Sequence, residues 1–380
     1  GGMNLCGWGD PNGSPAQKAL YHTFMAVNNS TYDDMGQKKD NDYSRTFQGL
    51  VEGTTSANGL PLLRAKVPTE PALDDPHFNE DFLQGNNSFN TVLGKVYKDV
   101  SFPFTKDAVF KSSTNENDPE QYAKYWYYDS SKASLYLKQD QTNGKYYLES
   151  PIDSAGNPTT DDHSKNMNQS GGATHGFFPF NETVPGNANA AQYNYGFGAK
   201  LQFDFTLTQN GKVVVGKDAT SGEDIEVPIK FFFSGDDDVW VYIDGELVLD
   251  VGGAHGKASG LLEFGADSTV TPYVSSNKNT DTKDPLVYTT DANNKTVYFN
   301  QNPIKFTKTT DKPTQLDKNR TTHTLTMFYM ERGMWDSNMA VAFNFPDSNE
   351  LQVEKQVDLD NVNPDFKPLF QGQNLFTFTL

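Results

Sequence analysis

The stretch that most constrains the fold is residues 231–256, in which three consecutive carboxylates stand directly before a predicted hairpin. Residues 239–243 and 246–251 are rich in β-branched and aromatic side chains, which favour strands. Asp244-Gly245 separates them, and this dipeptide tolerates the positive φ angles that a two-residue turn requires. The sequence therefore predicts an antiparallel hairpin with Asp236, Asp237 and Asp238 at its entrance.

The three adjacent carboxylates repel one another, and the neighbouring sequence offers no opposite charge. No Lys or Arg lies within five residues of the triplet. A bound cation is the simplest way to offset repulsion at this separation. The alternative is that the triplet only caps a turn.

Other segments also alternate as strands do. Residues 197–207 and 212–215 flank Asn210-Gly211 and predict a second hairpin. Three short aromatic runs within 123–150 predict a meander, and an insertion at 272–322 is expected to carry a small hairpin around 286–288 and 297–299. Residues 322–328 and 339–345 predict closing strands on either side of a polar loop at 331–338. The chain is therefore expected to be all-β.

Composition limits the classes of partner. The 380 residues suffice for one large β domain plus a fragment. A net charge of −18 disfavours nucleic acid and anionic membranes, and favours divalent cations and neutral partners such as sugars. The single Cys6 excludes an intrachain disulfide, and a chain so rich in Asn, Thr, Tyr and Gly suits an exported bacterial surface protein. No apolar run approaches the ~18 residues of a membrane span, and the start lacks a signal region, as expected of a mature or cloned fragment.

The motif at 234–255, from Ser-Gly-Asp-Asp-Asp to Gly-Gly-Ala-His, resembles the signature of fibro-slime domains. These domains are related to the β-sandwich module named from anthrax protective antigen and shared with yeast flocculins. Residues 176–181, 194–198, 328–332 and 337–338 extend the similarity, which spans roughly 170–346. The resemblance implies an antiparallel β-sandwich with long loop insertions and few short helices.

The resemblance also implies a metal site. In flocculin-type members, two neighbouring Asp residues joined by a cis peptide bind Ca²⁺, which coordinates sugar hydroxyls; the matching pair is Asp236 and Asp237. Because Ca²⁺ takes about 6 to 8 oxygens, other groups must contribute. Asn338, whose Ser-Asn belongs to the family pattern, is the candidate side-chain donor, with Asp336 beside it.

Four further residues are candidate ligand contacts. Asp238 stands where many family members have Gly, so it either orients the loop or adds a ligand. His255 belongs to the motif, but a lone His in a loop is often a hydrogen-bonding residue only. Trp335 lies in the closing loop, and Trp126 in the aromatic cluster at 125–128 could stack on a sugar or simply pack in the core.

The last residues change character. Residues 351–357 and 368–380 resemble the opening strands of Ig-like collagen-adhesin B-type stalk repeats. Lys355 matches the Lys that forms an isopeptide bond in such repeats, but the Asn-bearing last strand is absent from this chain. We therefore expect an adhesin domain at 1–350 and a stalk fragment at 351–380, from an extracellular protein anchored at the cell surface, in a Gram-positive cell wall.

These observations favour a calcium-dependent carbohydrate-binding adhesin module, a monomeric part of a longer chain. Its partners would be glycans on a host or neighbouring cell surface, or a polysaccharide. Two alternatives remain open: a structural or protein-binding tip domain in which calcium only rigidifies the fold, and a covalent adhesin with a thioester at Cys6. An enzyme is not expected, because glycosidase carboxylates lie ~5 to 9.5 Å apart on separate elements, unlike an adjacent triplet.

The thioester alternative has a direct test. With ordinary cysteine chemistry Cys6 stays a free thiol, so the intact mass should equal that of the unmodified chain. Mass spectrometry that finds about 17 Da less, the loss of ammonia from a Gln partner, would establish the thioester instead.

Overall fold

The computed structural model describes residues 2–7, 46, 48–49, 51–57, 59–62, 96–111, 117–150, 152–157, 176–180, 197–253, 255–275, 294–310, 312–331 and 337–346. The chain divides into two compact units, Gly1–Pro346 and Asp347–Leu380. The second unit, with Lys355 and the expected stalk fragment, lies outside the described residues. Among the residues that are described, no helix is long and apolar enough to cross a membrane.

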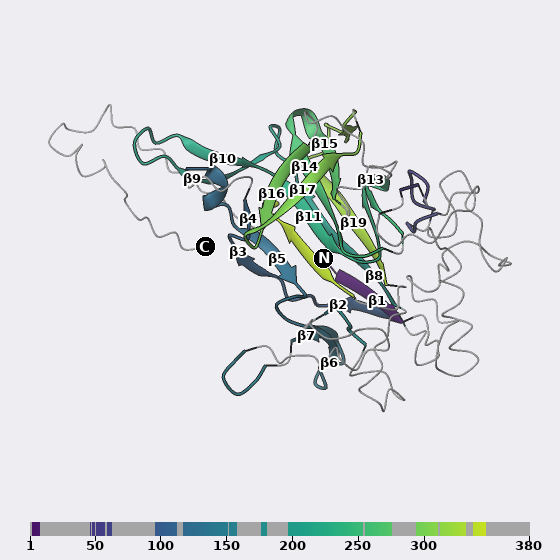
Figure 1. The fold of residues 1–380 in the computed structure, drawn as a ribbon. Coiled ribbons are helices and arrows are strands. Elements are labelled where there is room, and N and C mark those ends of the chain that lie inside the picture. The colour runs from purple at the N-terminus through teal and green to yellow at the C-terminus, as the bar shows by residue number, and fades with distance from the viewer. Residues whose placement is uncertain are drawn as a thin grey trace. The chain divides into compact units, whose positions relative to one another are not determined.

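The first unit is built on two antiparallel sheets (Figure 1). The smaller one has six strands in the order β13-β12-β19-β8-β1-β2. In sequence order these are β1 (Gly2–Gly7), β2 (Val96–Val100), β8 (Phe197–Thr206), β12 (Asp238–Ile243), β13 (Glu246–Val251) and β19 (Thr322–Glu331). Cys6 lies within β1 and pairs with Val96 and Gly198.

The larger sheet has ten strands, in the order β3-β5-β20-β11-β14-β15-β17-β16-β4, with β18 paired to β15. Its bounds are β3 (Thr105–Asp107), β4 (Phe110–Lys111), β5 (Tyr125–Asp129), β11 (Lys230–Gly235), β14 (Ala258–Gly265), β15 (Thr269–Ser275), β16 (Asn294–Phe299), β17 (Asn302–Lys308), β18 (Thr314–Gln315) and β20 (Met339–Phe343).

Two separate hairpins and two short helices complete the described structure. The hairpins pair β6 (Tyr136–Gln139) with β7 (Tyr146–Glu149), and β9 (Lys212–Lys217) with β10 (Asp224–Pro228). Helical structure in the described part is confined to the 3-10 turns η1 (Pro119–Tyr122) and η3 (Ala266–Ser268). The predicted all-β, antiparallel sandwich is therefore confirmed.

The main core lies between the two large sheets, because alternate residues of each strand face inward. β11 contributes Phe231 and Phe233, β12 contributes Val239 and Val241, and β19 contributes Tyr329, all fully buried. A second apolar cluster covers the opposite face of the ten-stranded sheet. Phe232 of β11 stacks there on Phe299 at the end of β16, with ring centroids 4.6 Å apart. β11 is therefore buried on both faces.

The predicted central hairpin is confirmed with the predicted turn. β12 pairs antiparallel with β13, and Ile243 faces Glu246 across the turn. Asp244 and Gly245 have φ angles of 52° and 86°, in the left-handed region that this turn requires. The register shifts between Val241 and Tyr242, a bulge that sequence alternation did not reveal.

Two strand pairings differ from expectation, and a third expected partner is not described. β8 and β9 exist, but β8 pairs with β19 and β1 while β9 pairs with β10, so 197–215 is no hairpin. The predicted meander is divided, since β6 pairs with β7 whereas β5 joins the ten-stranded sheet. β16 pairs with β17, and the expected partner at 286–288 lies outside the described residues. In the first two cases alternation predicted strands correctly but could not identify their partners, which depend on distant residues.

A buried ion pair secures the outer cluster. The Lys230 ammonium binds the Glu120 carboxylate of η1, lies 3.8 Å from Glu263 Oε1 and sits 5.1 Å from the centroid of the Phe110 ring. Burial raises the pKa of Glu120, and the charge of Lys230 opposes that rise. The Tyr125 pKa is raised well above its usual value by burial and then by the charges of Glu120 and Glu263. The ammonium and these carboxylates therefore depend on one another for compensation.

Removing one partner of this pair should cost more than removing both. Glu120→Ala leaves the Lys230 ammonium buried, and we expect a loss of about 3 kcal/mol in the free energy of unfolding. The double variant Lys230→Met/Glu120→Leu should lose less. Urea unfolding at pH 7 measures both, with Asp224→Ala as the control, because the Asp224 pair with Lys217 is exposed and contributes only about 0–1 kcal/mol. A double variant that loses as much free energy of unfolding as Glu120→Ala, or more, would refute the coupling.

Candidate functional site

The candidate site lies where the chain crosses between the two large sheets. β11 ends at Gly235 in one sheet and β12 begins at Asp238 in the other. The connection between β19 and β20 makes the same crossing. The two crossings lie together, because Gly235 pairs with Met339 and Asp238 pairs with Met330. Carboxylates in the first crossing therefore lie near Ser337 and Asn338, the described end of the closing loop predicted at 331–338.

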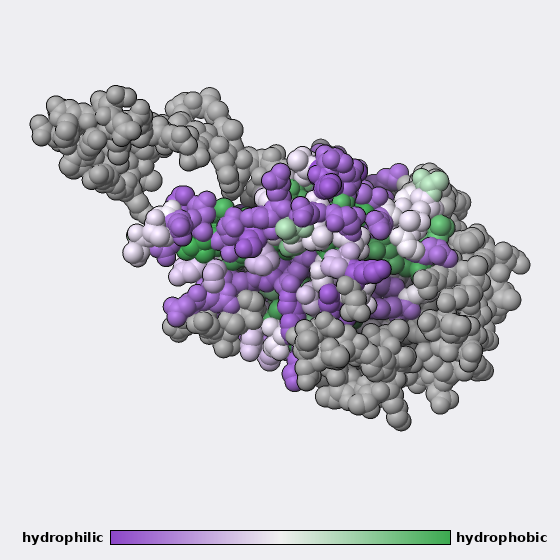
Figure 2. All heavy atoms as spheres, turned by 90° about the horizontal axis from the view of Figure 1, so that it is seen from above, coloured by the Kyte–Doolittle hydropathy of each residue, from purple (hydrophilic) through white to green (hydrophobic). Residues whose placement is uncertain are grey.

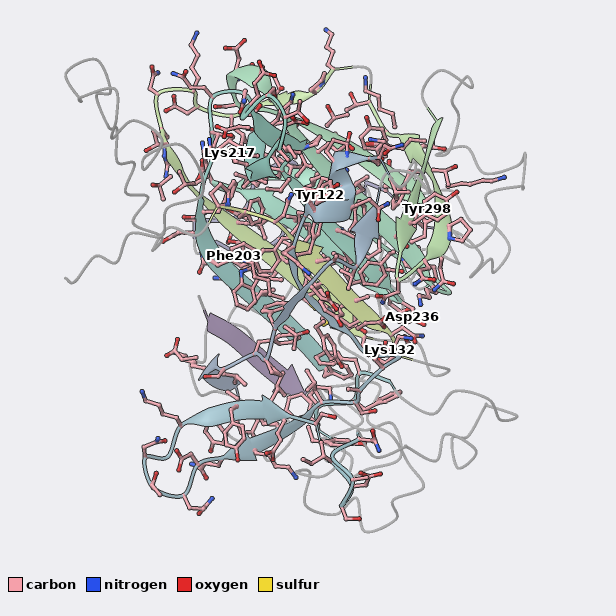
Figure 3. All side chains as sticks on the ribbon, turned by 90° about the vertical axis from the view of Figure 1, so that its left-hand side faces the viewer. Tyr122, Lys132, Phe203, Lys217, Asp236 and Tyr298 are labelled. Atoms are coloured by element: carbon pink, nitrogen blue, oxygen red, sulfur yellow. The ribbon has the colours of Figure 1, made fainter. Side chains whose placement is uncertain are left out.

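The acidic triplet is buried at this crossing. Asp236, Asp237 and Asp238 are 6%, 3% and 1% exposed. The peptide bond between Asp236 and Asp237 is cis, the conformation that the resemblance to flocculin-type domains implies. Figure 3 shows Asp236 beyond the ends of the strands, toward the same end of the molecule as Lys132.

Asn338 is the residue that the second crossing brings to Asp236. Its backbone N–H donates to Asp236 Oδ1, and its side-chain Nδ2 donates to Asp236 Oδ2 at 3.1 Å. The approach requires Gly235, since a Cβ there would lie 2.1 Å from the Asn338 carbonyl oxygen. The structure thus places Asn338, the candidate side-chain donor, against Asp236, with its amide nitrogen toward the carboxylate.

The other two carboxylates hold the loop that follows β13. Asp237 Oδ1 accepts from His255 N at 3.0 Å, and Asp238 Oδ1 accepts from Gly253 N. Gly253 has a φ of 107°, so the Gly-Gly bend uses the conformational freedom of glycine. Of the two roles considered for Asp238, the geometry supports orientation of this loop.

His255 serves the same loop with its ring. Nδ1 lies 2.7 Å from Gly256 O and Nε2 lies 3.3 Å from Val251 O. The ring is 4% exposed and its nitrogens face backbone carbonyls. These contacts support the interpretation of His255 as a hydrogen-bonding loop residue.

A buried tyrosine holds the crossing from beneath, and the sequence reasoning did not identify it as a site residue. Tyr329 Oη donates to the Asp236 carbonyl oxygen at 2.7 Å and lies 2.9 Å from Ser337 Oγ. A hydroxyl has one proton to donate, so Ser337 is the donor to Tyr329. Burial, followed by the charges of Glu331 and Asp236, raises the pKa of Tyr329 well above its usual value. The hydroxyl therefore stays protonated and able to donate; its only sequence signal was its place in the 328–332 motif.

Asp250 extends the acidic region behind Asp238. Its Oδ1 accepts from Gly252 N at 3.1 Å and its Oδ2 accepts from Gly49 N at 2.8 Å. Burial raises the Asp250 pKa to about 6, with a further increase from the negative charge of Asp238, while these hydrogen bonds act in the opposite direction. The carboxyl thus titrates in a mildly acidic range.

The arrangement offers oxygen donors of the kind that a hard cation prefers. Asp236 and Asp237 supply carboxylate oxygens, and a 180° turn of the Asn338 amide would exchange Nδ2 for Oδ1 beside Asp236. Ca²⁺ prefers carboxylate, amide and backbone carbonyl oxygens. Within the described ranges no group of three or more His, Cys, Asp or Glu side chains is arranged to hold a metal. A metal site here would therefore need amide or carbonyl oxygens in addition to the carboxylates of Asp236 and Asp237.

The remaining predicted residues divide into two kinds. Asp336 and Trp335 lie outside the described residues. Trp126 is half-buried on β5 with the Lys106 ammonium 5.3 Å from its ring centroid. It pairs with Phe343, which pairs with Phe231, five residues before Asp236. At about 3.4 Å per residue Trp126 is about 17 Å along the sheet from the acidic pair, so the structure does not bring them together.

Comparisons with known proteins give local similarity only. No protein-family profile matches the chain, and no solved structure does. It is 28% identical to psiH of Dictyostelium discoideum over 247 residues, which are 63% of this chain and 27% of psiH. It is 40% identical to psiP of the same organism over 70 residues, which are 18% of this chain and 7% of psiP. It is 62% identical to psiQ, also of that organism, over 29 residues, which are 8% of this chain and 3% of psiQ. The chain thus spans about a quarter or less of the length of these relatives.

The raised Asp250 pKa predicts a pH-dependent contribution to stability. Between the unfolded value near 4 and the folded value of about 6, the folded state binds more protons, so this group stabilises the fold as pH falls through 6 toward 4. Asp250→Asn removes the titration. The difference in unfolding free energy between wild type and variant should change in favour of wild type by up to about 3 kcal/mol from pH 7 to pH 4. Urea unfolding in chelator measures it, and a pH-independent difference would contradict the assignment.

Proposed function

We propose that the chain is a calcium-dependent carbohydrate-binding adhesin module of a cell-surface protein. The observation that carries the proposal is the pair of adjacent, buried carboxylates at the sheet crossing, with the Asn338 amide held against one of them. Asp236 and Asp237 are the proposed calcium ligands, Asn338 is a third through its amide oxygen, and Asp336 is a further candidate. Bound Ca²⁺ supplies a positive charge and open coordination positions for sugar hydroxyls.

Electrostatics supports a cation at this place. Burial penalises an ionised carboxylate unless hydrogen bonds and opposite charge compensate it. The backbone N–H groups of Asn338, His255 and Gly253 provide neutral donors to the three Asp side chains. Hydrogen bonds from neutral donors leave the negative charge on the carboxylates, and a divalent cation would offset it. The bound cation would also add to the stability of the folded chain by mass action.

The proposed ligands are sugars of a host cell, a neighbouring cell or a polysaccharide. The chain has a net charge of −18, and the face in Figure 2 is predominantly hydrophilic in its described part, as suits polar, uncharged partners. Sugar hydroxyls replace water on the ion with little net gain, so we expect single-site dissociation constants near the millimolar end, about −4 kcal/mol. Several copies on a surface would raise the effective affinity.

A structural tip domain is the second candidate. Its support is that the hydrogen bonds to the triplet join three segments of the fold: the crossing between β11 and β12, the loop after β13 and the segment before β20. In that case calcium would stabilise the chain without binding sugar. Sugar binding, rather than metal binding, therefore distinguishes the two functions.

Replacing both proposed ligands should abolish calcium-dependent sugar binding while the sandwich still folds. Asp236→Asn/Asp237→Asn keeps the shape of both side chains and removes their charges. Wild type should melt at a higher temperature in calcium than in chelator, whereas the variant should show equal melting curves. Isothermal titration with the best-bound sugar should give no detectable heat for the variant.

The matched control is Glu223→Gln/Asp224→Asn. It also removes two adjacent carboxylates, from the exposed end of the β9–β10 hairpin. This control should retain both the calcium shift and the sugar affinity. Sugar binding retained by a folded Asp236→Asn/Asp237→Asn variant would rule out the calcium-bridged mechanism.

A further inference from the structure

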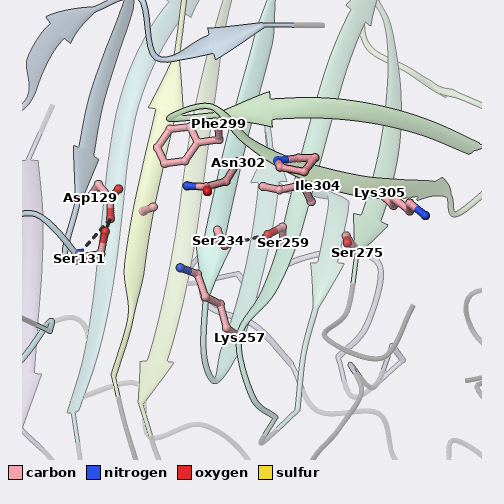
Figure 4. A pocket seen from close by; sticks show the side chains of 12 residues that line it. Asp129, Ser131, Ser234, Lys257, Ser259, Ser275, Phe299, Asn302, Ile304 and Lys305 are labelled. Carbon is pink, nitrogen blue, oxygen red and sulfur yellow. Dashed lines mark hydrogen bonds between the residues drawn. The ribbon is translucent and has the colours of Figure 1, made fainter. Parts of the chain in front are cut away.

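A pocket of about 470 Å³ opens on the outer face of the ten-stranded sheet (Figure 4). Its floor is a row of residues in register across five strands, Asp129 of β5, Ala340 of β20, Ser234 of β11, Ser259 of β14 and Ser275 of β15. Small side chains along this row leave the space. The volume is in the range of small-ligand sites, about 300–1,000 Å³.

The floor is polar although it is buried. Ser234, Ser259 and Ser275 are each 4–5% exposed, and Ser259 Oγ donates to Ser234 Oγ at 2.8 Å. A hydroxyl can accept as well as donate, so this row can exchange hydrogen bonds with ligand hydroxyls. Figure 4 shows the Asn302 amide above the row, from the start of β17.

One wall of the pocket is apolar. Phe299 ends β16, and Pro303 and Ile304 follow in β17. The β16–β17 hairpin is fixed there because Phe299 stacks on Phe232 beneath it. A flat ring with hydroxyls on its edge and C–H groups on its face would match a polar floor and an apolar wall.

The charged groups at the pocket favour an anion. Figure 4 shows Lys257 with its ammonium directed toward the floor, and Lys305 at the opposite rim with its ammonium directed outward. The carboxylate of Asp129 is already engaged, since Oδ1 accepts from the backbone and hydroxyl of Ser131 and Oδ2 accepts from Asn300 Nδ2 at 2.7 Å. Lys257 therefore directs a positive charge at the pocket floor, where both oxygens of the Asp129 carboxylate already accept hydrogen bonds.

We propose that this pocket is a second ligand site, which binds an acidic sugar residue of the uronic acid type. Its carboxylate pairs with Lys257, its hydroxyls bind the serine row and Asn302, and its ring lies against Phe299 and Ile304. The site is separate from the acidic crossing and needs no metal. It does not rest on the proposed calcium-dependent function.

The test is isothermal titration with glucuronate and with glucose after calcium has been removed by a chelator. Because an exposed ion pair contributes up to about 1 kcal/mol, glucuronate should bind up to about fivefold more tightly than glucose. Lys257→Gln should remove that preference. Because Lys257 is exposed, Lys257→Gln is not expected to unfold the protein, and circular dichroism checks that the variant is folded.

Two controls make each outcome decisive. Lys318→Gln makes the same charge change at an exposed turn before β19, and it should leave glucuronate binding unchanged. Asp236→Asn/Asp237→Asn should also retain it, even if calcium-dependent binding is lost. Equal affinity for glucose and glucuronate, an unaffected Lys257→Gln variant, or glucuronate binding that requires calcium would each overturn the proposal.

Discussion

The burial of three adjacent carboxylates at a crossing between two sheets is the constraint on which the rest of the site depends. The carboxylates are held by two other parts of the fold: Asp236 by the closing segment at Asn338, and Asp237 and Asp238 by His255 and Gly253 of the loop after β13. Buried charge is costly unless it is paired or hydrogen-bonded. The loops around the triplet are therefore positioned by the same groups that the proposed ion would bind.

Large apolar side chains anchor the crossing on both sides. Phe233 precedes it in β11, Val239 follows it in β12, and both are fully buried in the core between the sheets. Tyr329 reaches from that core to the Asp236 carbonyl, and it also meets Ser337 just before Asn338. A polar site at the end of a packed sandwich is thus positioned by elements buried in the core, as binding sites require.

Local sequence chemistry predicted the strands β8, β12, β13, β19 and β20, the Asp244-Gly245 turn and the acidic entrance, because each depends on residues close together in the chain. It could not predict that β8 and β9 belong to different sheets, since alternation is the same whichever strand becomes the partner. The meeting of Asn338 with Asp236 was expected only through the family resemblance. The support from Tyr329 and the serine row under the pocket were not foreseen, because both arise from register between strands distant in sequence.

The central claim is that sugar binds this protein by coordinating a calcium ion held by Asp236 and Asp237. The most direct measurement is a glycan array probed with the wild-type chain in calcium and again in excess chelator. The account predicts that a defined set of neutral glycans is bound in calcium and lost in chelator, and that readdition of calcium restores it. Neutral glycans bound equally well in both conditions, or bound in neither, would contradict it.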